Sequence, residues 1–251
     1  MLSIKEKKMA VQVGIGAYPD GKDGPQTWDY LYRKHADPKV PYAVKLYNQW
    51  CFVTKPERVG VFDPNGLSAR NYSNFVSGSF SWAHAPISIM VNHGKTIRAE
   101  ACHAWIVDRN GKPLPESVLW YKKDGTYGIS VVAYDWEIPG RDDVVWAIGG
   151  AGLADYAWDP YTRTYGVVDE GFVGPYADVF RYTTHILVGF DPFGYFNAVY
   201  VSKMNGTQMK ALAKKLCLTH YILLDGGHVT ACNVDGIKRN TKQAQHWGIQ
   251  L

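Results

Sequence analysis

The chain has 251 residues, of which 46% are hydrophobic and 20% are charged, and its formal net charge is +4. This composition excludes a disordered chain, and the length allows one large domain with a single core. The 27 basic residues barely outnumber the 23 acidic ones and form no dense run, which argues against a dedicated nucleic-acid-binding protein.

Features of membrane, secreted and cofactor-binding proteins are also missing from the sequence. No stretch approaches the ~18 consecutive apolar residues of a membrane-spanning helix. Residues 1–8 lack the apolar centre of a secretory signal, so we expect a cytoplasmic protein, or one found in a virion or outside the cell after lysis. The four cysteines are too scattered for a disulfide scaffold or a zinc site, and the glycines near Gly14 do not form a dinucleotide fingerprint. We therefore expect no cofactor and no bound metal.

Most of the predicted elements are short strands separated by turns. In chain order, strands are expected at residues 11–15, 58–62 and 74–80, with a short helix between residues 28 and 47. Hairpins follow at residues 87–98, from residue 104 onward, and at 118–133, each with a turn rich in Asn, Asp or Gly. Further strands are expected at residues 144–148, 182–190, 196–203 and 221–224. The interpretation is an α+β protein: a strand-rich mixed sheet with few helices.

One helix has strong support in the sequence, over residues 206–218. Its apolar residues Met209, Leu212, Ala213 and Leu216 recur at the spacing of one helical face, and Thr207 is a plausible N-cap. No linker divides the chain. The simplest organisation is an N-terminal elaboration, residues 1–57, packed on a main domain, residues 58–251.

The most informative stretch is Tyr221-Ile-Leu-Leu-Asp-Gly-Gly-His228. Four apolar residues predict a buried strand, which ends at Asp225 and is followed by two glycines. The preceding strand, helix and final strand form a βαβ-like unit, and ligands of such sheets lie beyond the carboxyl ends of the strands. In isolation an Asp-Gly-Gly segment is more often a tight turn than a site.

Aromatic residues make up 14% of the chain, including 17 Tyr and 9 Trp. Several lie in loop-like segments between residues 146 and 165. Rings with an apolar face and a polar edge suit sugar stacking and protein interfaces, and they also fill the core of β-rich proteins.

Several segments together resemble a known family. In chain order they are Ser77-Gly-Ser-Phe80, Ala147-Ile-Gly-Gly150, His185-Ile-Leu-Val-Gly189, Gly206-Thr-Gln-Met-Lys-Ala-Leu-Ala213 and Leu223-Leu-Asp-Gly-Gly-His-Val-Thr230. Over roughly residues 58–236 they resemble the phosphodiester glycosidase family, whose members have a domain like that of N-acetylglucosamine-1-phosphodiester alpha-N-acetylglucosaminidase. This chain departs from the family pattern: His185 replaces an Arg, Ser77 an Asn, His228 a Gly and Val229 a Ser.

The resemblance implies roles for particular residues. Asp225 would act near the anomeric carbon, as a base or as a stabiliser of positive charge, with His185 and His228 beside the phosphate. The backbone of Gly78, Gly226 and Gly227 would approach the ligand, and Ser77, Ser79 and Thr230 would bind sugar hydroxyls.

Three functional hypotheses remain open at this point. The first is a hydrolase that cleaves a sugar-1-phosphodiester bond in a cell-surface glycopolymer or glycoconjugate, with delivery by a phage as one route to that surface. The second is a non-catalytic glycan-binding or structural module of a phage tail or surface assembly, with virion proteins or a second copy of the chain as partners. The third is a metal-dependent phosphodiesterase that uses His185, Asp225 and His228.

Overall fold

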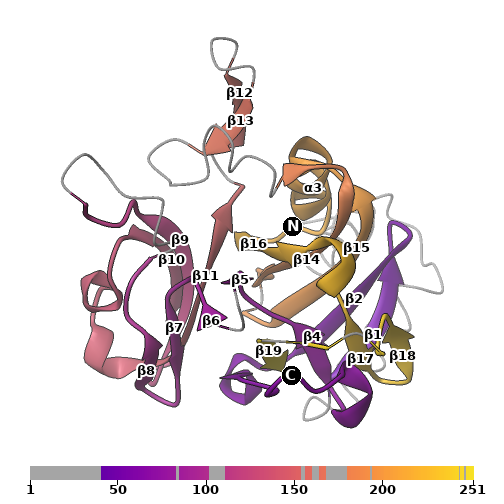
Figure 1. The fold of residues 1–251 in the computed structure, drawn as a ribbon, viewed down its shortest axis with the longest axis horizontal. Helices are drawn as coiled ribbons and strands as arrows, with labels where there is room; N and C mark the ends of the chain where they lie inside the picture. The colour runs from indigo at the N-terminus through magenta and orange to yellow at the C-terminus, as the bar shows by residue number, and fades with distance from the viewer. Residues whose placement is uncertain are drawn as a thin grey trace, which may run out of the picture.

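The computed structural model describes residues 41–82, 85–101, 111–153, 156–159, 164–167, 180–192, 194–242, 244–245 and 247–251. Within these residues the expected α+β, strand-rich class is confirmed, with many strands and one α-helix, α3 (Gly206–Lys215). Figure 1 shows α3 above the strands β14, β15 and β16, and the short strands β4, β17 and β19 below them. Among the helices in this part of the chain, none has the length and apolar character needed to cross a bilayer.

A ten-stranded sheet forms the centre of the molecule. Its strand order is β1-β2-β15-β14-β16-β11-β7-β8, with β9 paired to β11 and β10 paired to β9. The strands are β1 (Tyr42–Leu46), β2 (Gln49–Thr54), β7 (Met90–Asn92), β8 (Lys95–Arg98), β9 (Glu116–Lys122), β10 (Tyr127–Val132), β11 (Val144–Gly152), β14 (Thr183–Phe190), β15 (Phe196–Met204) and β16 (His220–Gly226).

A smaller sheet of five strands has the order β18-β17-β4-β19-β3. Its strands are β3 (Gly60–Phe62), β4 (Phe75–Ser77), β17 (Cys232–Val234), β18 (Ile237–Arg239) and β19 (Gly248–Gln250). Two further pairs are β5 (Ser81–Trp82) with β6 (Ala85–Pro86), and β12 (Tyr156–Asp159) with β13 (Thr164–Val167). The short 3-10 helices are η1 (Pro56–Arg58), η2 (Ala69–Asn71), η3 (Asp135–Glu137), η4 (Arg141–Asp143) and η6 (Gly227–Val229).

The large sheet buries both of its faces. Alternate residues of β16 point to opposite sides because side chains alternate along a strand. Leu223 packs with Met209 and the other apolar residues of α3, whereas Ile222 packs with Val76 and Ile249 of the smaller sheet. The central strands are therefore apolar on both faces, and this explains why the run from Tyr221 to Leu224 contains no polar residue.

Neighbouring strands in the described residues all pair antiparallel. β14 is antiparallel to both β15 and β16, so these two strands run in the same direction with β14 between them. The predicted strand–helix–strand unit is thus present in a split form. Because every paired ladder is antiparallel, the sheet is antiparallel over the described residues, whereas the sequence had predicted a mixed sheet.

Three local predictions are corrected or restricted by the structure. Residues 42–46 form β1, which pairs with β2, so they are not part of the short helix expected between residues 28 and 47; residues 28–40 lie outside the described residues. The strand expected at residues 58–62 starts only at Gly60, because residues 56–58 form η1. The N-cap of α3 is Asn205 instead of Thr207: its side chain accepts a hydrogen bond from the Gln208 backbone nitrogen at 3.0 Å, and its own backbone nitrogen donates one to the Gln208 side chain.

Other predictions are confirmed or lie outside the described residues. The hairpins β7–β8 and β9–β10 and the strands β11, β14 and β15 occur where they were expected. The predicted strands at residues 11–15 and 104–107 fall outside the described residues. Within residues 41–57, β2 pairs with β15 and so extends the main sheet. The division of the chain at residue 57 stays a prediction.

Candidate functional site

Asp225 lies in a bulge near the end of β16. Leu223 is opposite Leu187 of β14, but Gly226 is opposite His185, so β16 has one more residue than β14 over this span. Such a bulge breaks the regular alternation and redirects a side chain, and bulges are common beside functional sites. Asp225 consequently leaves the pattern of the buried strand and is only half-buried.

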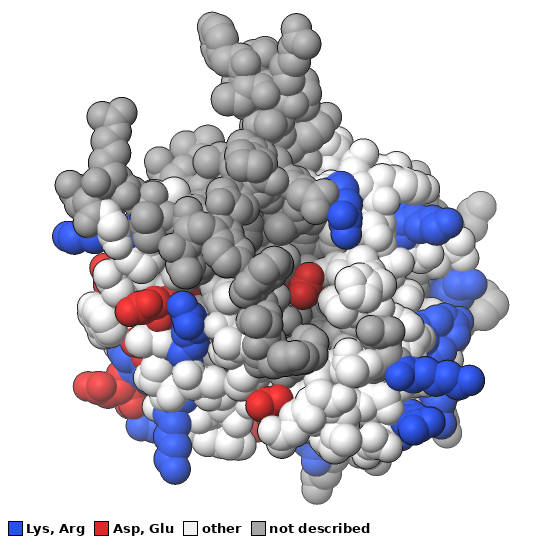
Figure 2. All heavy atoms as spheres, viewed as in Figure 1, with Lys and Arg blue, Asp and Glu red and all other residues white. Residues whose placement is uncertain are grey.

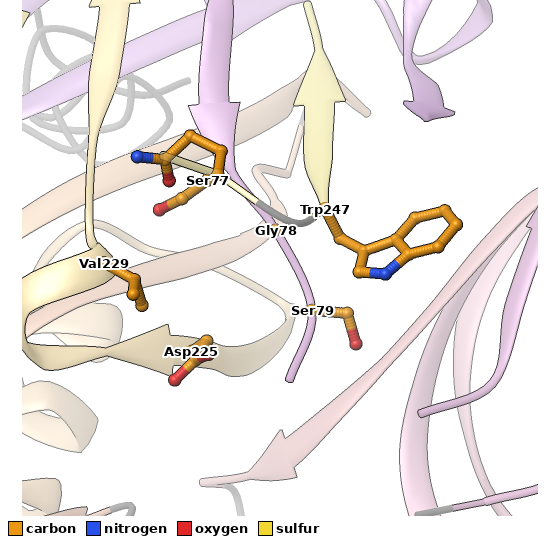
Figure 3. A pocket seen from close by; sticks show the side chains of 7 residues that line it. Ser77, Gly78, Ser79, Asp225, Val229 and Trp247 are labelled. Carbon is orange, nitrogen blue, oxygen red and sulfur yellow. The ribbon is translucent and has the colours of Figure 1, made fainter. Parts of the chain in front are cut away.

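Three distant parts of the chain meet around Asp225 in a small pocket (Figure 3). Its lining comes from the end of β16 and η6, from the last residue of β4 and the two residues after it, and from the segment before β19: Asp225, Val229, Ser77, Gly78, Ser79, Gln245 and Trp247. The Asp225 backbone nitrogen donates to the Gly78 carbonyl oxygen at 3.3 Å. The described residues leave about 10 Å³ for the centre of a water-sized molecule, which is room for about one water.

The predicted sugar-binding hydroxyls already have partners within the protein. Ser77 Oγ accepts from the Ala231 nitrogen at 3.1 Å, and Ser79 Oγ donates to the Gly149 carbonyl at 3.0 Å. Thr230 Oγ1 donates to the Thr184 carbonyl at 3.1 Å, and Thr230 does not line the pocket. The structure thus brings Ser77, Gly78 and Ser79 to Asp225 but leaves Thr230 out. In Figure 3 the Asp225 carboxylate and the Ser79 hydroxyl point to opposite sides of the segment between them.

His185 lies behind Gly226 and not in the pocket. It is 1% exposed, and a Cβ built on Gly226 would be 2.4 Å from its Nδ1 atom. Its Nε2 atom is 3.0 Å from the Arg181 carbonyl, so this nitrogen carries the proton in the neutral ring. Burial lowers the pKa of His185; the bond to the Arg181 carbonyl partly opposes this and the Arg181 charge reinforces it. His185 is therefore placed to support the Asp225–Gly226 backbone as a neutral ring.

His228 is exposed, in η6, and it too is absent from the pocket lining. Its backbone carbonyl accepts a hydrogen bond from the Asn240 side chain. Within the described part of the chain, no three His, Cys, Asp or Glu side chains converge so that they could hold a metal ion. His185, Asp225 and His228 consequently do not form the metal triad that the sequence left open.

Arg181 was not predicted to belong to the site, although it lies close to Gly227. The backbone φ of Gly227 is +77°, a conformation that favours glycine, and a Cβ built there would be 3.2 Å from Nη2 of Arg181. The guanidinium is thus beside the backbone two residues after Asp225. In the family pattern, the residue four positions before Gly189 is an Arg, and in this chain it is His185. Arg181, four positions before His185, is a basic residue near the expected place, and this was the only sign of its role in the sequence.

Trp247 and Gln245 were also missed, because they come from the far C-terminal segment. The Trp247 indole nitrogen is buried and has no hydrogen-bond partner in the described structure. Figure 3 shows this nitrogen on the edge of the ring that faces Ser79. The pocket therefore contains an N–H donor that a ligand oxygen could accept from.

Charge is unevenly distributed over the molecule. Figure 2 shows several Lys and Arg side chains along the side where Figure 1 places α3, β1 and β18. Lys214, Lys45 and Lys238 are exposed on these elements, and Asp235, in the turn before β18, bonds to the Ala43 backbone of β1. An excess of basic side chains attracts anionic ligands over a distance set by the salt concentration.

Comparison with known proteins finds similarity in structure only. No family model matches the sequence, and no curated protein matches it. The catalytic domain of zebrafish N-acetylglucosamine-1-phosphodiester alpha-N-acetylglucosaminidase, auto-inhibited by its pro-peptide, is 15% identical with a TM-score of 0.59, over 84% of this chain and 81% of that one. The two chains share a fold.

Two other solved structures are less similar. A hypothetical protein from Synechocystis has 11% identity and a TM-score of 0.48, over 84% of this chain and 61% of that one. A Burkholderia pseudomallei protein assigned as exported has 12% identity and a TM-score of 0.49, over 81% of this chain and 73% of that one. At these identities the chemistry has to be argued from the site itself.

Proposed function

We propose that this protein is a hydrolase that cleaves a sugar-1-phosphodiester bond in a cell-surface glycopolymer or glycoconjugate. The observation that carries the proposal is the position of Asp225: a half-buried carboxylate in a strand bulge, at a pocket built by three distant segments, with the Arg181 guanidinium beside Gly227, two residues further along the chain. A carboxylate for the sugar and a cation for the phosphate are the combination that this reaction requires.

The proposed step consumes one water molecule. The water oxygen forms a bond to the anomeric carbon, the bond between this carbon and the phosphate oxygen breaks, and its electron pair leaves with the phosphate. Asp225 stabilises the positive charge on the sugar or takes the proton of the water. A phosphate monoester is a good leaving group, so a second carboxyl group is not required as an acid.

Arg181 is proposed to hold the phosphate, since a guanidinium donates two parallel hydrogen bonds to phosphate oxygens. His185 is then a positioning residue. Its neutral ring packs on Gly226, and its bond to the Arg181 carbonyl ties the Arg181 backbone to β14, which pairs with the strand that carries Asp225. In this arrangement the cation that the family pattern places at residue 185 is supplied from residue 181.

The test is release of free sugar from methyl phosphodiesters of N-acetylglucosamine, glucose and galactose 1-phosphate. We expect Asp225→Asn to lower kcat by at least about 100-fold, the usual contribution of such a group. Arg181→Ala should lower kcat/KM by about 10- to 100-fold, equivalent to one charge-assisted contact. The matched controls are Asp142→Asn and Arg70→Ala, which change exposed charges elsewhere. No turnover of any of these diesters, or full activity in Asp225→Asn, would refute the proposal.

A second candidate is a non-catalytic glycan-binding or structural module with the same fold, for example in a phage tail or another surface assembly. It is favoured by the small size of the pocket and by the internal partners of Ser77, Ser79 and Thr230. In that case the protein would bind the sugar phosphate without releasing sugar, and Asp225→Asn would change binding alone.

A further inference from the structure

A second and larger depression lies at the opposite end of the central strands. Its volume is about 320 Å³, and its lining includes Tyr121, Tyr127 and Tyr195 together with Lys55 and Glu57. These residues come from three separate segments: η1 with the residue before it, the β9–β10 hairpin, and the β14–β15 turn. We refer to it as the tyrosine groove.

The tyrosine groove is separate from the pocket around Asp225. Tyr127 stacks on Phe190 with ring centroids 4.1 Å apart, and Phe190 pairs with His220, the first residue of β16. Asp225 is near the last residue of the same strand. The length of β16 therefore lies between the two sites.

The floor of the groove is held by the aromatic core. Tyr121 stacks on Trp146 at 6.1 Å and 24°, and Trp146 is fully buried. The indole nitrogen of Trp146 donates to the Pro56 carbonyl at 2.7 Å, which ties η1 to the same ring. Because the rings are fixed before a ligand arrives, binding costs little conformational entropy on the protein side.

Two glycines leave the groove without side chains at its rim. Gly125 has a φ of +87° and no atom within 4 Å of a built Cβ, so this edge is open. Gly194 has a φ of +79°, and a Cβ there would be 3.2 Å from Tyr127. Both turns favour glycine, and at neither position does a side chain narrow the groove.

We propose that the tyrosine groove binds one or two units of a neutral carbohydrate chain. Tyrosine rings present apolar faces to the C–H face of a pyranose, and their hydroxyl groups bind the ring substituents. Glu57 accepts and Lys55 donates hydrogen bonds, which matches sugar hydroxyl groups because each of these both donates and accepts. The volume is at the lower end of the roughly 300–1,000 Å³ of ligand sites.

The competing occupant of an aromatic groove is a proline-rich peptide. Its prolines carry no N–H, so such a segment offers mainly carbonyl acceptors. It would leave the Glu57 carboxylate facing other acceptors, and covering a charge without a donor is unfavourable. The charges on Lys55 and Glu57 therefore favour a polyol ligand over a polyproline helix.

The groove would also specify the substrate of the proposed hydrolase, and this part of the inference rests on the proposed function. If the substrate is a glycopolymer, the groove would hold a segment of the chain away from the bond that is cleaved. Loss of the groove should then raise KM for the polymer and leave kcat/KM for a small methyl phosphodiester unchanged.

The direct test is binding, which does not depend on catalysis. Trisaccharides of glucose, galactose, mannose and N-acetylglucosamine are titrated into the full chain and followed by saturation-transfer NMR and calorimetry. We expect one of them to bind, with Glu57→Gln weakening it about tenfold, the loss expected for one hydrogen bond to a charged group. Tyr195→Ala should weaken binding about five- to tenfold through the loss of ring contact.

Two controls separate this site from others. Trp136→Ala removes an aromatic ring that is 60% exposed elsewhere on the surface, and it should leave binding unchanged. Asp225→Asn should also leave it unchanged, so failure of the groove and failure of the hydrolase are seen independently. Binding of none of the trisaccharides, binding unaltered in both groove variants, or binding of a decaproline peptide in their place would overturn the inference.

Discussion

Substitution of Gly226 by alanine tests the packing behind Asp225. A Cβ at this position would be 2.4 Å from Nδ1 of His185 and 2.8 Å from the Thr184 carbonyl oxygen. Ordinary contacts of this kind are about 3.5 Å, so roughly 1 Å of movement is needed. His185 is 1% exposed and bonded to the Arg181 carbonyl at 3.0 Å, so it cannot turn away without losing that bond.

The expected cost follows from these contacts. Overpacking of a buried site costs about 1–3 kcal/mol, and loss of the Arg181 hydrogen bond adds about 0.5–1.5 kcal/mol. We therefore expect Gly226→Ala to lower the free energy of unfolding by about 2–4 kcal/mol, which corresponds to a fall in Tm of about 4–16 °C for a chain of this size. The double variant Gly226→Ala/His185→Ala should lose at least about 1 kcal/mol less than the sum of the single variants, because the clash disappears with the imidazole.

The assay is urea unfolding followed by tryptophan fluorescence. The matched control is Gly60→Ala, also in a strand, where a built Cβ would be 3.7 Å from its nearest neighbour and should cost little. A Gly226→Ala protein as stable as the Gly60→Ala protein, or strictly additive effects in the double variant, would show that His185 does not pack on Gly226 as described.

Three further predictions concern the helix cap, the buried thiols and the buried imidazole. Asn205→Ala should lower the free energy of unfolding by about 1 kcal/mol, because it removes the N-cap of α3. Thr207→Ala, at the second residue of the helix, should lower it much less in the same urea assay. Burial raises the pKa of Cys51 and of Cys232 to about 12, so at pH 8 about one thiol in 10,000 is ionised. Iodoacetamide should therefore label these two cysteines only after the protein is unfolded, and peptide mapping measures the labelling. Burial lowers the pKa of His185 in the folded protein, whereas in the unfolded chain this histidine has its ordinary pKa of about 6.5. As the pH falls below about 6.5 the unfolded chain therefore binds more protons than the folded protein, and the free energy of unfolding decreases. The His185→Asn protein should lose less stability than the parent between pH 7.5 and pH 5.0, and equal losses would contradict the assignment.

Local patterns in the sequence predicted much of the secondary structure. The spacing of Met209, Leu212 and Leu216 places α3 correctly because one helical face must be apolar to pack on a sheet. The turn residues of the β7–β8 and β9–β10 hairpins mark connections whose geometry needs only a few adjacent residues. These features depend on neighbours in the chain, so the sequence is enough to read them.

The candidate site was predicted only in part. Asp225, Ser77, Gly78 and Ser79 do lie together, as the resemblance implied. His185 and Thr230 are buried beside the pocket, and His228 is exposed outside it. No pattern of alternation predicts a bulge, and one extra residue in β16 changes which groups face the pocket.

By itself, then, the sequence determined the strand-rich class, the single strong helix and the carboxylate at the end of a buried strand. Only the tertiary structure decided what surrounds that carboxylate. Trp247 reaches the pocket because β19 pairs with β4, and Arg181 reaches Gly227 because β14 pairs with β16. Such pairings join residues far apart in the chain, and they are selected by the burial of whole sheet faces, which no short segment encodes.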